Sequence, residues 1–385
     1  MRKLLLLLSL LIPAYCMGQV KITGKVINMT DTKPVPNASV FLNNAQVGNK
    51  TADDGTFTLS NVKPGKYDFI ISIVGYETYT YSLQAGSANI NLGTISIIPK
   101  TFQLNEIKIR PDPNREKYYA IFRQQFLGYS DNAAKCKILN SDVLDFDYDE
   151  ATRILKATSH DFLEIENKAL GYKIRYKLTN FNYNPAKAML YYEGISNFED
   201  LKGTEKQKRK WRKERQSAYL GSYMHFYRSA IKDSLTQENF VVMRLIRKPN
   251  PNYHGGPNNK YLQSLVNKPL DRADFFKLTD QEGLFAIGFT DCLYVMYTKK
   301  GREASDNSFQ AFNMPNNATT IISFDEPYAF FDNNGIVANP HSVIYEGDWG
   351  ISRVAEMLPV DYEPVVEKSK SESEFSELKD LQNIV

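Results

Sequence analysis

Seven basic side chains between residues 206 and 215 form the strongest charged cluster that the sequence offers for binding. They are Lys206, Lys208, Arg209, Lys210, Arg212, Lys213 and Arg215. Cations near the start of a helix oppose the helix dipole, so such a cluster carries a small cost in stability. The cluster is therefore the best candidate for docking an acidic envelope protein, an anionic lipid surface or an anionic glycan. The favoured interpretation of these residues is nevertheless a solvated helix start stabilised by Glu205 and Glu214, and Trp211 indicates that one side of the helix is covered.

A second candidate is the acidic run Asp-Phe-Asp-Tyr-Asp-Glu over residues 145–150. Its alternating carboxylates would share one face of a strand, where they could bind calcium. An EF-hand loop needs Gly at its sixth position and Glu at its twelfth, but the chain has Glu150 and Lys156 there. The EF-hand is therefore excluded. A solvated strand face is the favoured interpretation, a looser calcium site is the alternative, and no metal site is assigned.

The sequence contains no recognisable motif for nucleophilic or general-base catalysis. HExxH, GxSxG, P-loop and GxGxxG patterns do not occur. The four histidines are dispersed along the chain: His160, His225, His254 and His341. Of these, His225 lies beside Tyr223, which favours a buried or interface histidine over a base. The sequence assigns no catalytic residue and no cofactor, and it leaves open a hydrolase that acts on peptide or glycan through dispersed carboxylates such as Asp145, Asp147 or Asp291.

The start of the chain predicts export. Two basic residues and an apolar stretch over residues 4–12 precede Cys16-Met17-Gly18, which has small side chains at the positions that signal peptidase reads. Residues 1–18 are therefore predicted to be a signal peptide, which places the mature chain in the periplasm or at the outer membrane. A lipoprotein acylated at Cys16 is the alternative, although Tyr15 stands where a small residue is required. No second long apolar run follows, so no transmembrane segment is predicted for the mature chain.

Net charge and cysteine content bear on two further properties, nucleic-acid binding and disulfide formation. The chain has 47 basic and 44 acidic residues, and removal of the signal peptide leaves a net charge of about +1. This balance gives no electrostatic footprint for nucleic acid. Cys136 and Cys292 follow the signal peptide. In an oxidising compartment they could form a disulfide, and the alternative is two buried thiols among apolar neighbours.

Turn residues punctuate the segment 19–100 at regular intervals, between stretches in which apolar and polar residues alternate. The pattern predicts about seven short strands packed as a β-sandwich. The motifs that carry it are Gly24-Lys25-Val26, Pro36-Asn37-Ala38, Asp53-Asp54-Gly55, Pro64-Gly65-Lys66, Val74-Gly75-Tyr76 and Leu92-Gly93-Thr94. As a set they resemble the carboxypeptidase-regulatory-like family. That resemblance implies a transthyretin-like sandwich that serves as an accessory module or spacer and carries no catalytic residue.

Residues 115–360 are predicted to form a larger domain, between a linker over 101–114 and a charged tail over 361–385. Strand-like alternation prevails from 135 to 198 and returns beyond 240. The predicted fold class is therefore mainly β, or α+β. It comprises an N-terminal transthyretin-like β-sandwich and a larger β-rich domain with one long and one shorter helix.

The long helix is predicted as one continuous element over 204–235, with Tyr219 and Tyr223 on its apolar side. The motifs Leu170-Gly171-Tyr172 and Trp211-Arg212-Lys213 resemble uncharacterised exported proteins of Bacteroidota type that carry the same N-terminal module. That class implies no established activity.

Together these patterns predict a non-catalytic binding or scaffolding protein of the cell envelope, in which the sandwich acts as a spacer or docking module. Enzymatic activity is left uncertain, with the dispersed-carboxylate hydrolase as one alternative. Carbohydrate binding by the sandwich is another. It is disfavoured because both tryptophans, Trp211 and Trp349, lie outside that module.

Overall fold

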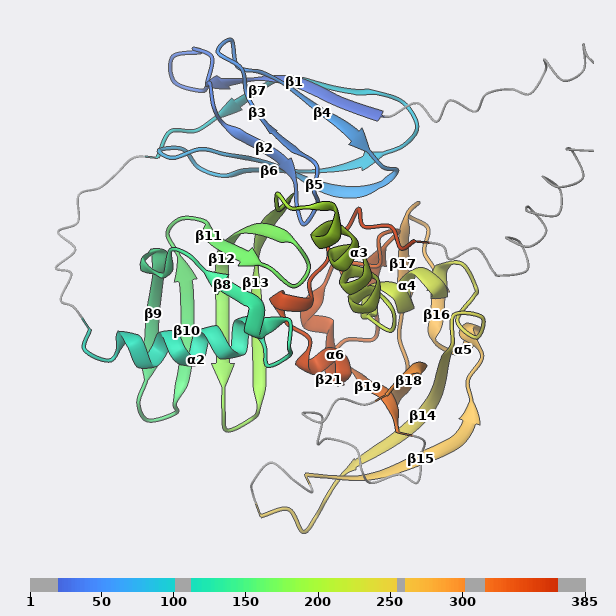
Figure 1. Ribbon diagram of the computed structural model, residues 1–385. Helices are drawn as coiled ribbons and strands as arrows, with labels where there is room; N and C mark the ends of the chain where they lie inside the picture. Colours follow the sequence, from blue (N-terminus) through green and yellow to red (C-terminus); the bar gives the residue numbers. More distant parts are fainter. Residues whose placement is uncertain (1–19, 101–111, 255–259, 302–315, 366–385) are drawn as a thin grey trace, which may run out of the picture. The chain divides into compact units, whose positions relative to one another are not determined.

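The computed structural model describes residues 20–100, 112–254, 260–301 and 316–365 (Figure 1). The predicted signal peptide, most of the predicted linker and most of the charged tail lie outside the described residues. The described chain divides into two compact units, one with strands β1 to β7 and the other with elements α2 to α6. Strands dominate both units, which confirms the predicted mainly β, or α+β, fold class.

The first unit is a two-sheet sandwich. One sheet has the strand order β4-β1-β7 and the other β3-β2-β5-β6. Strand β1 pairs antiparallel with β4 and parallel with β7. Phe57 of β4 and Phe69 of β5 bring the two sheets together, with ring centroids 5.5 Å apart. The strands are β1 (Val20–Asn28), β2 (Ser39–Leu42), β3 (Gly48–Lys50), β4 (Thr56–Val62), β5 (Gly65–Ser72), β6 (Tyr79–Ala85) and β7 (Ile90–Ile97).

The second unit begins with helix α2 (Arg115–Leu127) and a six-stranded sheet. The strand order is β8-β11-β12-β10-β9, and β13 pairs with β12. Residues along β12 alternate between buried and more exposed, so the sheet has one core face. The strands are β8 (Cys136–Ile138), β9 (Leu144–Asp149), β10 (Ile154–Ser159), β11 (Leu163–Asn167), β12 (Tyr172–Asn184) and β13 (Met189–Asp200).

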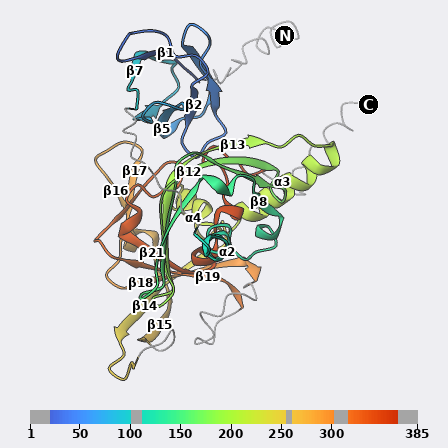
Figure 2. The same cartoon turned by 90° about the vertical axis from the view of Figure 1, so that its left-hand side faces the viewer.

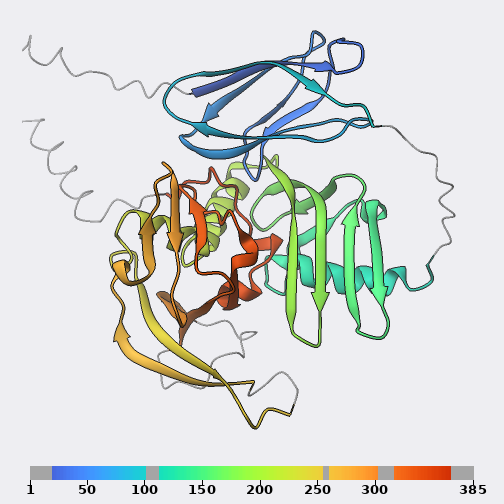
Figure 3. The same ribbon diagram turned by 180° about the vertical axis from the view of Figure 1, so that it is seen from behind.

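Helix α2 covers the core face of this sheet, as the two views in Figure 1 and Figure 2 show. Phe122 of α2 lies 4.8 Å from Phe181 of β12, and Phe126 lies 5.2 Å from Tyr176 of the same strand, centroid to centroid. Figure 3 shows the sheet from its other side, where the strands lie in front of α2. Aromatic packing on one face therefore fixes the helix on the sheet.

The remainder of the second unit is built on two smaller sheets. A five-stranded sheet has the order β15-β14-β18-β19-β21, and a three-stranded sheet has the order β16-β17-β20. Its elements are α3 (Glu205–Tyr219), α4 (Tyr223–Ile231), β14 (Phe240–Pro249), β15 (Tyr261–Pro269), α5 (Arg272–Phe275), β16 (Phe276–Leu278), β17 (Leu284–Ile287), β18 (Cys292–Gly301), β19 (Asn317–Phe324), β20 (Ala329–Asp332), β21 (Val343–Gly347) and α6 (Asp348–Ile351).

The predicted continuous helix over 204–235 is wrong, because the structure divides it into α3 and α4. Gly221 has φ +82°, in the left-handed region that ends a helix. Ser222 then starts α4, since its hydroxyl oxygen accepts the backbone N–H of His225 at 3.2 Å. Ser222 is thus the N-cap of α4. The predicted continuous helix would have placed it in a helix interior.

The cysteine alternative is also decided. Cys136 and Cys292 are both free and buried, and they belong to separate core clusters. The disulfide is therefore not formed. Burial raises the pKa of the Cys136 thiol to about 12, which makes this side chain an inert core residue.

The break between α3 and α4 gives a first prediction. A Cβ at Gly221 would lie 2.7 Å from Tyr297 Cδ1 on a backbone with φ +82°. Gly221→Ala is therefore expected to lower the free energy of unfolding by about 2–4 kcal/mol, from strain and overpacking together. Gly75→Ala is the control, because Gly75 has φ +86° but no atom within 4 Å. Its loss should be about 1–2 kcal/mol. Equal losses in urea unfolding of the two variants would contradict the close approach to Tyr297.

Candidate functional site

Helix α3 carries the predicted basic cluster, and its start is fixed by a capping box. Thr204 Oγ1 accepts the backbone N–H of Gln207 at 3.3 Å, and Gln207 Oε1 accepts the backbone N–H of Thr204 at 2.8 Å. Two otherwise unpaired donors at the first turn are satisfied in this way. The cap offsets part of the unfavourable effect of cations near the positive end of the helix dipole.

One aromatic side chain joins α3 to the loops beside the six-stranded sheet. Trp211 is buried, and its indole Nε1 donates to the carbonyl oxygen of Lys168 at 3.1 Å. The indole lies against two glycines: a Cβ at Gly171 would be 2.1 Å from Trp211 Cδ2, and one at Gly203 would be 2.5 Å from its Cη2. Both positions must lack a side chain for the indole to fit. The expectation that Trp211 marks a covered side of the helix is confirmed.

Arg215 holds the same side of α3 one turn further on. Its Nε donates to the carbonyl oxygen of Leu170 at 2.7 Å, and its Nη2 contacts Asp200 Oδ1 at 2.6 Å. The guanidinium carbon lies 3.7 Å from the ring centroid of Tyr172, a cation–π contact. Only 13% of the Arg215 side chain is exposed. Arg215 therefore maintains the fold, and it is set apart from the other six predicted binding residues.

The other six basic residues of α3 are exposed. Within the described chain, Lys208 pairs with Glu205 at 2.9 Å. No ion pair is found there for the other five cations. We call the six residues the α3 basic surface: Lys206, Lys208, Arg209, Lys210, Arg212 and Lys213. The arrangement can bind a polyanion electrostatically, because five of these exposed cations have no ion-pair partner among the described residues and can contact phosphate or carboxylate groups.

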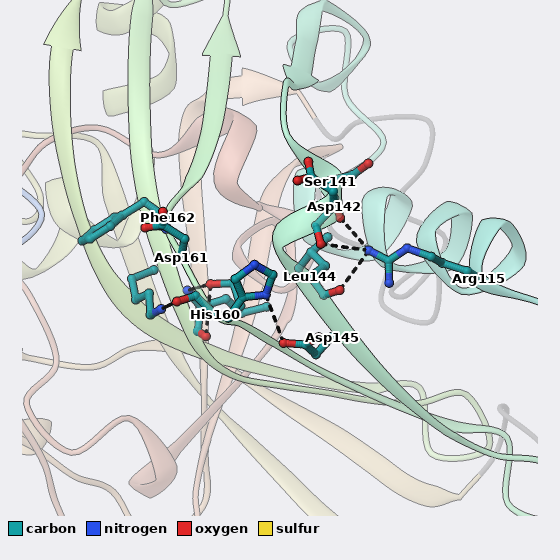
Figure 4. A network of polar contacts seen from close by, with 11 residues as sticks. Arg115, Ser141, Asp142, Leu144, Asp145, His160, Asp161 and Phe162 are labelled. Carbon is teal, nitrogen blue, oxygen red and sulfur yellow. Dashed lines mark hydrogen bonds and ion pairs between the residues drawn. The ribbon is translucent and has the colours of Figure 1, made fainter. Parts of the chain in front are cut away.

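The carboxylates of the alternative hydrolase are not brought together by any described contact. Asp145 and Asp147 are exposed on β9, the edge strand of the six-stranded sheet. Asp145 Oδ2 lies 3.4 Å from His160 Nδ1, a solvent-exposed pair (Figure 4). Asp291 precedes β18 of the five-stranded sheet and pairs with Arg244 at 2.7 Å. Among the described residues, no group of three or more His, Cys, Asp or Glu side chains could hold a metal.

Figure 4 also shows what fixes the start of β9 near Asp145. Arg115 of α2 donates through Nη2 to the carbonyl oxygens of Ser141 and Leu144, each at 2.9 Å. This guanidinium therefore joins α2 to the edge of the sheet. The acidic residues beside it form the solvated strand face that the sequence favoured.

The histidines take structural or exposed positions. His225 is 3% exposed, and its Nδ1 accepts the backbone N–H of Gly221 at 3.1 Å. Its Nε2 is therefore the protonated nitrogen, and it donates to Glu238 at 3.1 Å. His341 stacks on Tyr191 at 4.2 Å between centroids, while His160 and His254 are exposed. The expectation of a satisfied, buried His225 is confirmed.

Comparison with known proteins identifies the first unit. Residues 22–109 match the CarboxypepD_reg-like domain family, so this part of the chain is a carboxypeptidase-regulatory-like domain, as its turn motifs predict. The mouse (Mus musculus) protein "BOS complex subunit NOMO1" is 35% identical over 95 residues. That match covers 25% of this chain but 7% of NOMO1, so the chain spans a small part of the relative's length.

Solved structures offer weaker likenesses. A type II cohesin–X-dockerin complex from Acetivibrio cellulolyticus aligns with TM-score 0.19 and 20% identity, over 20% of this chain and 56% of the other. A DUF3823 family protein from Bacteroides uniformis ATCC 8492 aligns with TM-score 0.16 and 9% identity, over 81% of this chain and 98% of the other. Scores at this level carry no argument about fold or function.

The contact between Trp211 and its two glycines gives a second prediction. Trp211→Ala is expected to lower the free energy of unfolding by about 3–5 kcal/mol. It removes a buried aromatic side chain, and the glycines beside it have no side chains that could fill the space. Lys210→Ala, at the exposed neighbouring position, should change it by less than about 0.5 kcal/mol. Urea unfolding followed by circular dichroism measures both. Equal stability of the two variants would show that Trp211 does not hold α3.

His225 gives a third prediction, on pH. Burial lowers the pKa of His225 below its ordinary 6.5, against a smaller raising effect of Glu238. The unfolded chain therefore takes up a proton near pH 6.5 that the folded chain resists, and stability should fall as pH falls below that value. Protonation would also remove the acceptor for the Gly221 N–H. His225→Gln should reduce the loss of stability between about pH 7.5 and about pH 5.5. His160→Gln, an exposed control, should keep the wild-type loss; if both variants keep it, His225 is not the titrating group.

Proposed function

We propose that this chain is a non-catalytic binding or scaffolding protein of the cell envelope, and that the α3 basic surface docks a polyanion. The carboxypeptidase-regulatory-like domain serves as a spacer or docking module. The predicted export signal supports a location in the periplasm or at the outer membrane. The observation that carries the proposal is that six exposed cations lie on a helix that Trp211 and Arg215 fix to the rest of the unit.

The composition of the surface indicates electrostatic docking without insertion of apolar side chains. None of the large apolar side chains that are exposed in the described chain lies on α3. Each Lys or Arg near an anionic surface contributes about 1 kcal/mol, and this attraction weakens as salt screens it. No described helix is long and apolar enough to cross a membrane. The shared chemistry of the partner is thus a dense array of phosphate or carboxylate groups.

A fourth prediction tests this proposal with two probes, vesicles containing phosphatidylglycerol and soluble polygalacturonate. The variant is the triple change Lys206→Gln, Lys210→Gln and Lys213→Gln. It should weaken binding to the preferred probe by at least about tenfold, because it removes three charges from one surface. Added salt should weaken binding of the wild type as well. Cosedimentation and titration calorimetry measure the two probes and distinguish a lipid from a glycan partner.

The matched control is the triple change Lys137→Gln, Lys156→Gln and Lys268→Gln, which removes the same charge from exposed positions outside α3. This control should bind as the wild type does. Equal loss in the two triple variants would mean that net charge, and not the α3 basic surface, governs binding. Failure of the wild type to bind either probe, together with binding to an acidic protein, would contradict the polyanion surface as partner.

A further inference from the structure

A cavity of about 490 Å³ lies in the second unit, beside the C-terminal half of α2. Ala120, Arg123 and Gln124 line it from the helix, and Tyr129 and Ala134 line it from the following loop. The volume falls within the range of about 300–1,000 Å³ that small-molecule sites occupy. None of its lining residues belongs to the α3 basic surface. The cavity is therefore a candidate site separate from the proposed docking surface.

Hydrogen bonds fix the loop wall of the cavity. The side-chain amide of Gln125, which is 9% exposed, donates to the hydroxyl of Tyr129 at 2.5 Å. Glu356 accepts from the Ser130 hydroxyl at 2.5 Å and from the Asn132 amide at 2.8 Å. The aromatic wall and the loop are thus held in place before any ligand binds, which lowers the entropic cost of binding.

The charges around the cavity favour an anion. Arg123 is exposed at its edge, and within the described chain it has no ion-pair partner. Among the described residues that line the cavity, Arg123 is the only charged one. The aliphatic part of a second arginine lies behind Gly128, because a Cβ at Gly128 would come within 3.1 Å of Arg353 Cβ. The Nε of Arg353 is buried without a hydrogen-bond partner among the described residues. Glu356 does not line the cavity, and its oxygens accept hydrogen bonds from Ser130 and Asn132 of the loop.

The other lining groups suit a ring. Tyr129 presents a half-exposed aromatic side chain, and its hydroxyl is occupied by Gln125. Small side chains, such as those of Ala120 and Ala134, are among the other lining groups. Aromatic rings stack on the apolar faces of planar or sugar rings, while an Arg guanidinium binds a carboxylate with two parallel hydrogen bonds.

From this geometry we infer that the cavity binds a small carboxylate carried on a six-membered ring. Arg123 binds the carboxylate, Gln124 hydrogen-bonds a polar substituent, and Tyr129 packs against the ring. A sugar acid and an aromatic acid share this chemistry. The probes D-glucuronate and benzoate separate the two sources, and D-glucose and benzamide are the uncharged controls.

Saturation-transfer NMR and titration calorimetry on the full mature chain test the inference. At least one carboxylate probe should bind saturably and more tightly than its uncharged control. Arg123→Gln should weaken that binding about tenfold or more, since it removes a charged hydrogen-bond donor. Ala120→Leu, an exposed helix position that tolerates leucine, should abolish binding by filling the cavity.

Lys137→Gln is the matched control, because it removes one exposed cation outside the cavity. It should bind the probe as the wild type does, and circular dichroism should show that all three variants are folded. Absence of saturable binding of both carboxylates would overturn the inference. Equal binding of a carboxylate and its uncharged control, or unchanged binding by Ala120→Leu, would do the same. None of these outcomes depends on polyanion binding by α3, so the two proposals fail separately.

Discussion

In the second unit, the attachment of α3 depends on the packing of Trp211 against Gly171 and Gly203. The indole occupies space that any side chain at either glycine would fill, and its Nε1 donates to Lys168 in the same segment. Arg215 extends the contact to the carbonyl oxygen of Leu170 and to the ring of Tyr172 at the start of β12. An otherwise polar helix, with few apolar residues of its own, is thereby joined to the six-stranded sheet.

The consequences continue along the chain from α3 into α4. Leu220 and Tyr223 flank the helix break, and both pack against two core clusters, one under α2 and one under α4. The break itself is fixed by Gly221, whose carbonyl oxygen accepts the indole N–H of Trp349 at 2.7 Å. The contact of Trp211, the helix break at Gly221 and the core cluster under α4 therefore follow one another along the chain. The cations of the α3 basic surface remain exposed to solvent.

Local chemistry explains which features the sequence could predict. The turns of the first unit need particular residues at particular positions, so the motif around Gly55 identified the sandwich without knowledge of its packing. The basic cluster was visible because seven Lys and Arg residues lie between positions 206 and 215. By contrast, apolar periodicity continues across Gly221, which hid the helix break, although a glycine followed by Ser222 is itself a stop-and-cap signal.

The role of Arg215 depends on Leu170 and Tyr172, which are distant in sequence, and no local pattern reveals such a contact. The cavity beside Tyr129 also escaped prediction, because it forms between α2 and the segment that follows it, and no residue pattern marks such a gap.

The central claim is that α3 is the docking face of the protein. The most direct measurement is hydrogen–deuterium exchange of the wild-type chain with and without the polyanion that binds it. The account predicts added protection in peptides covering Glu205–Tyr219, with little change in the first unit. Protection confined to other segments, with exchange in α3 unchanged, would contradict it.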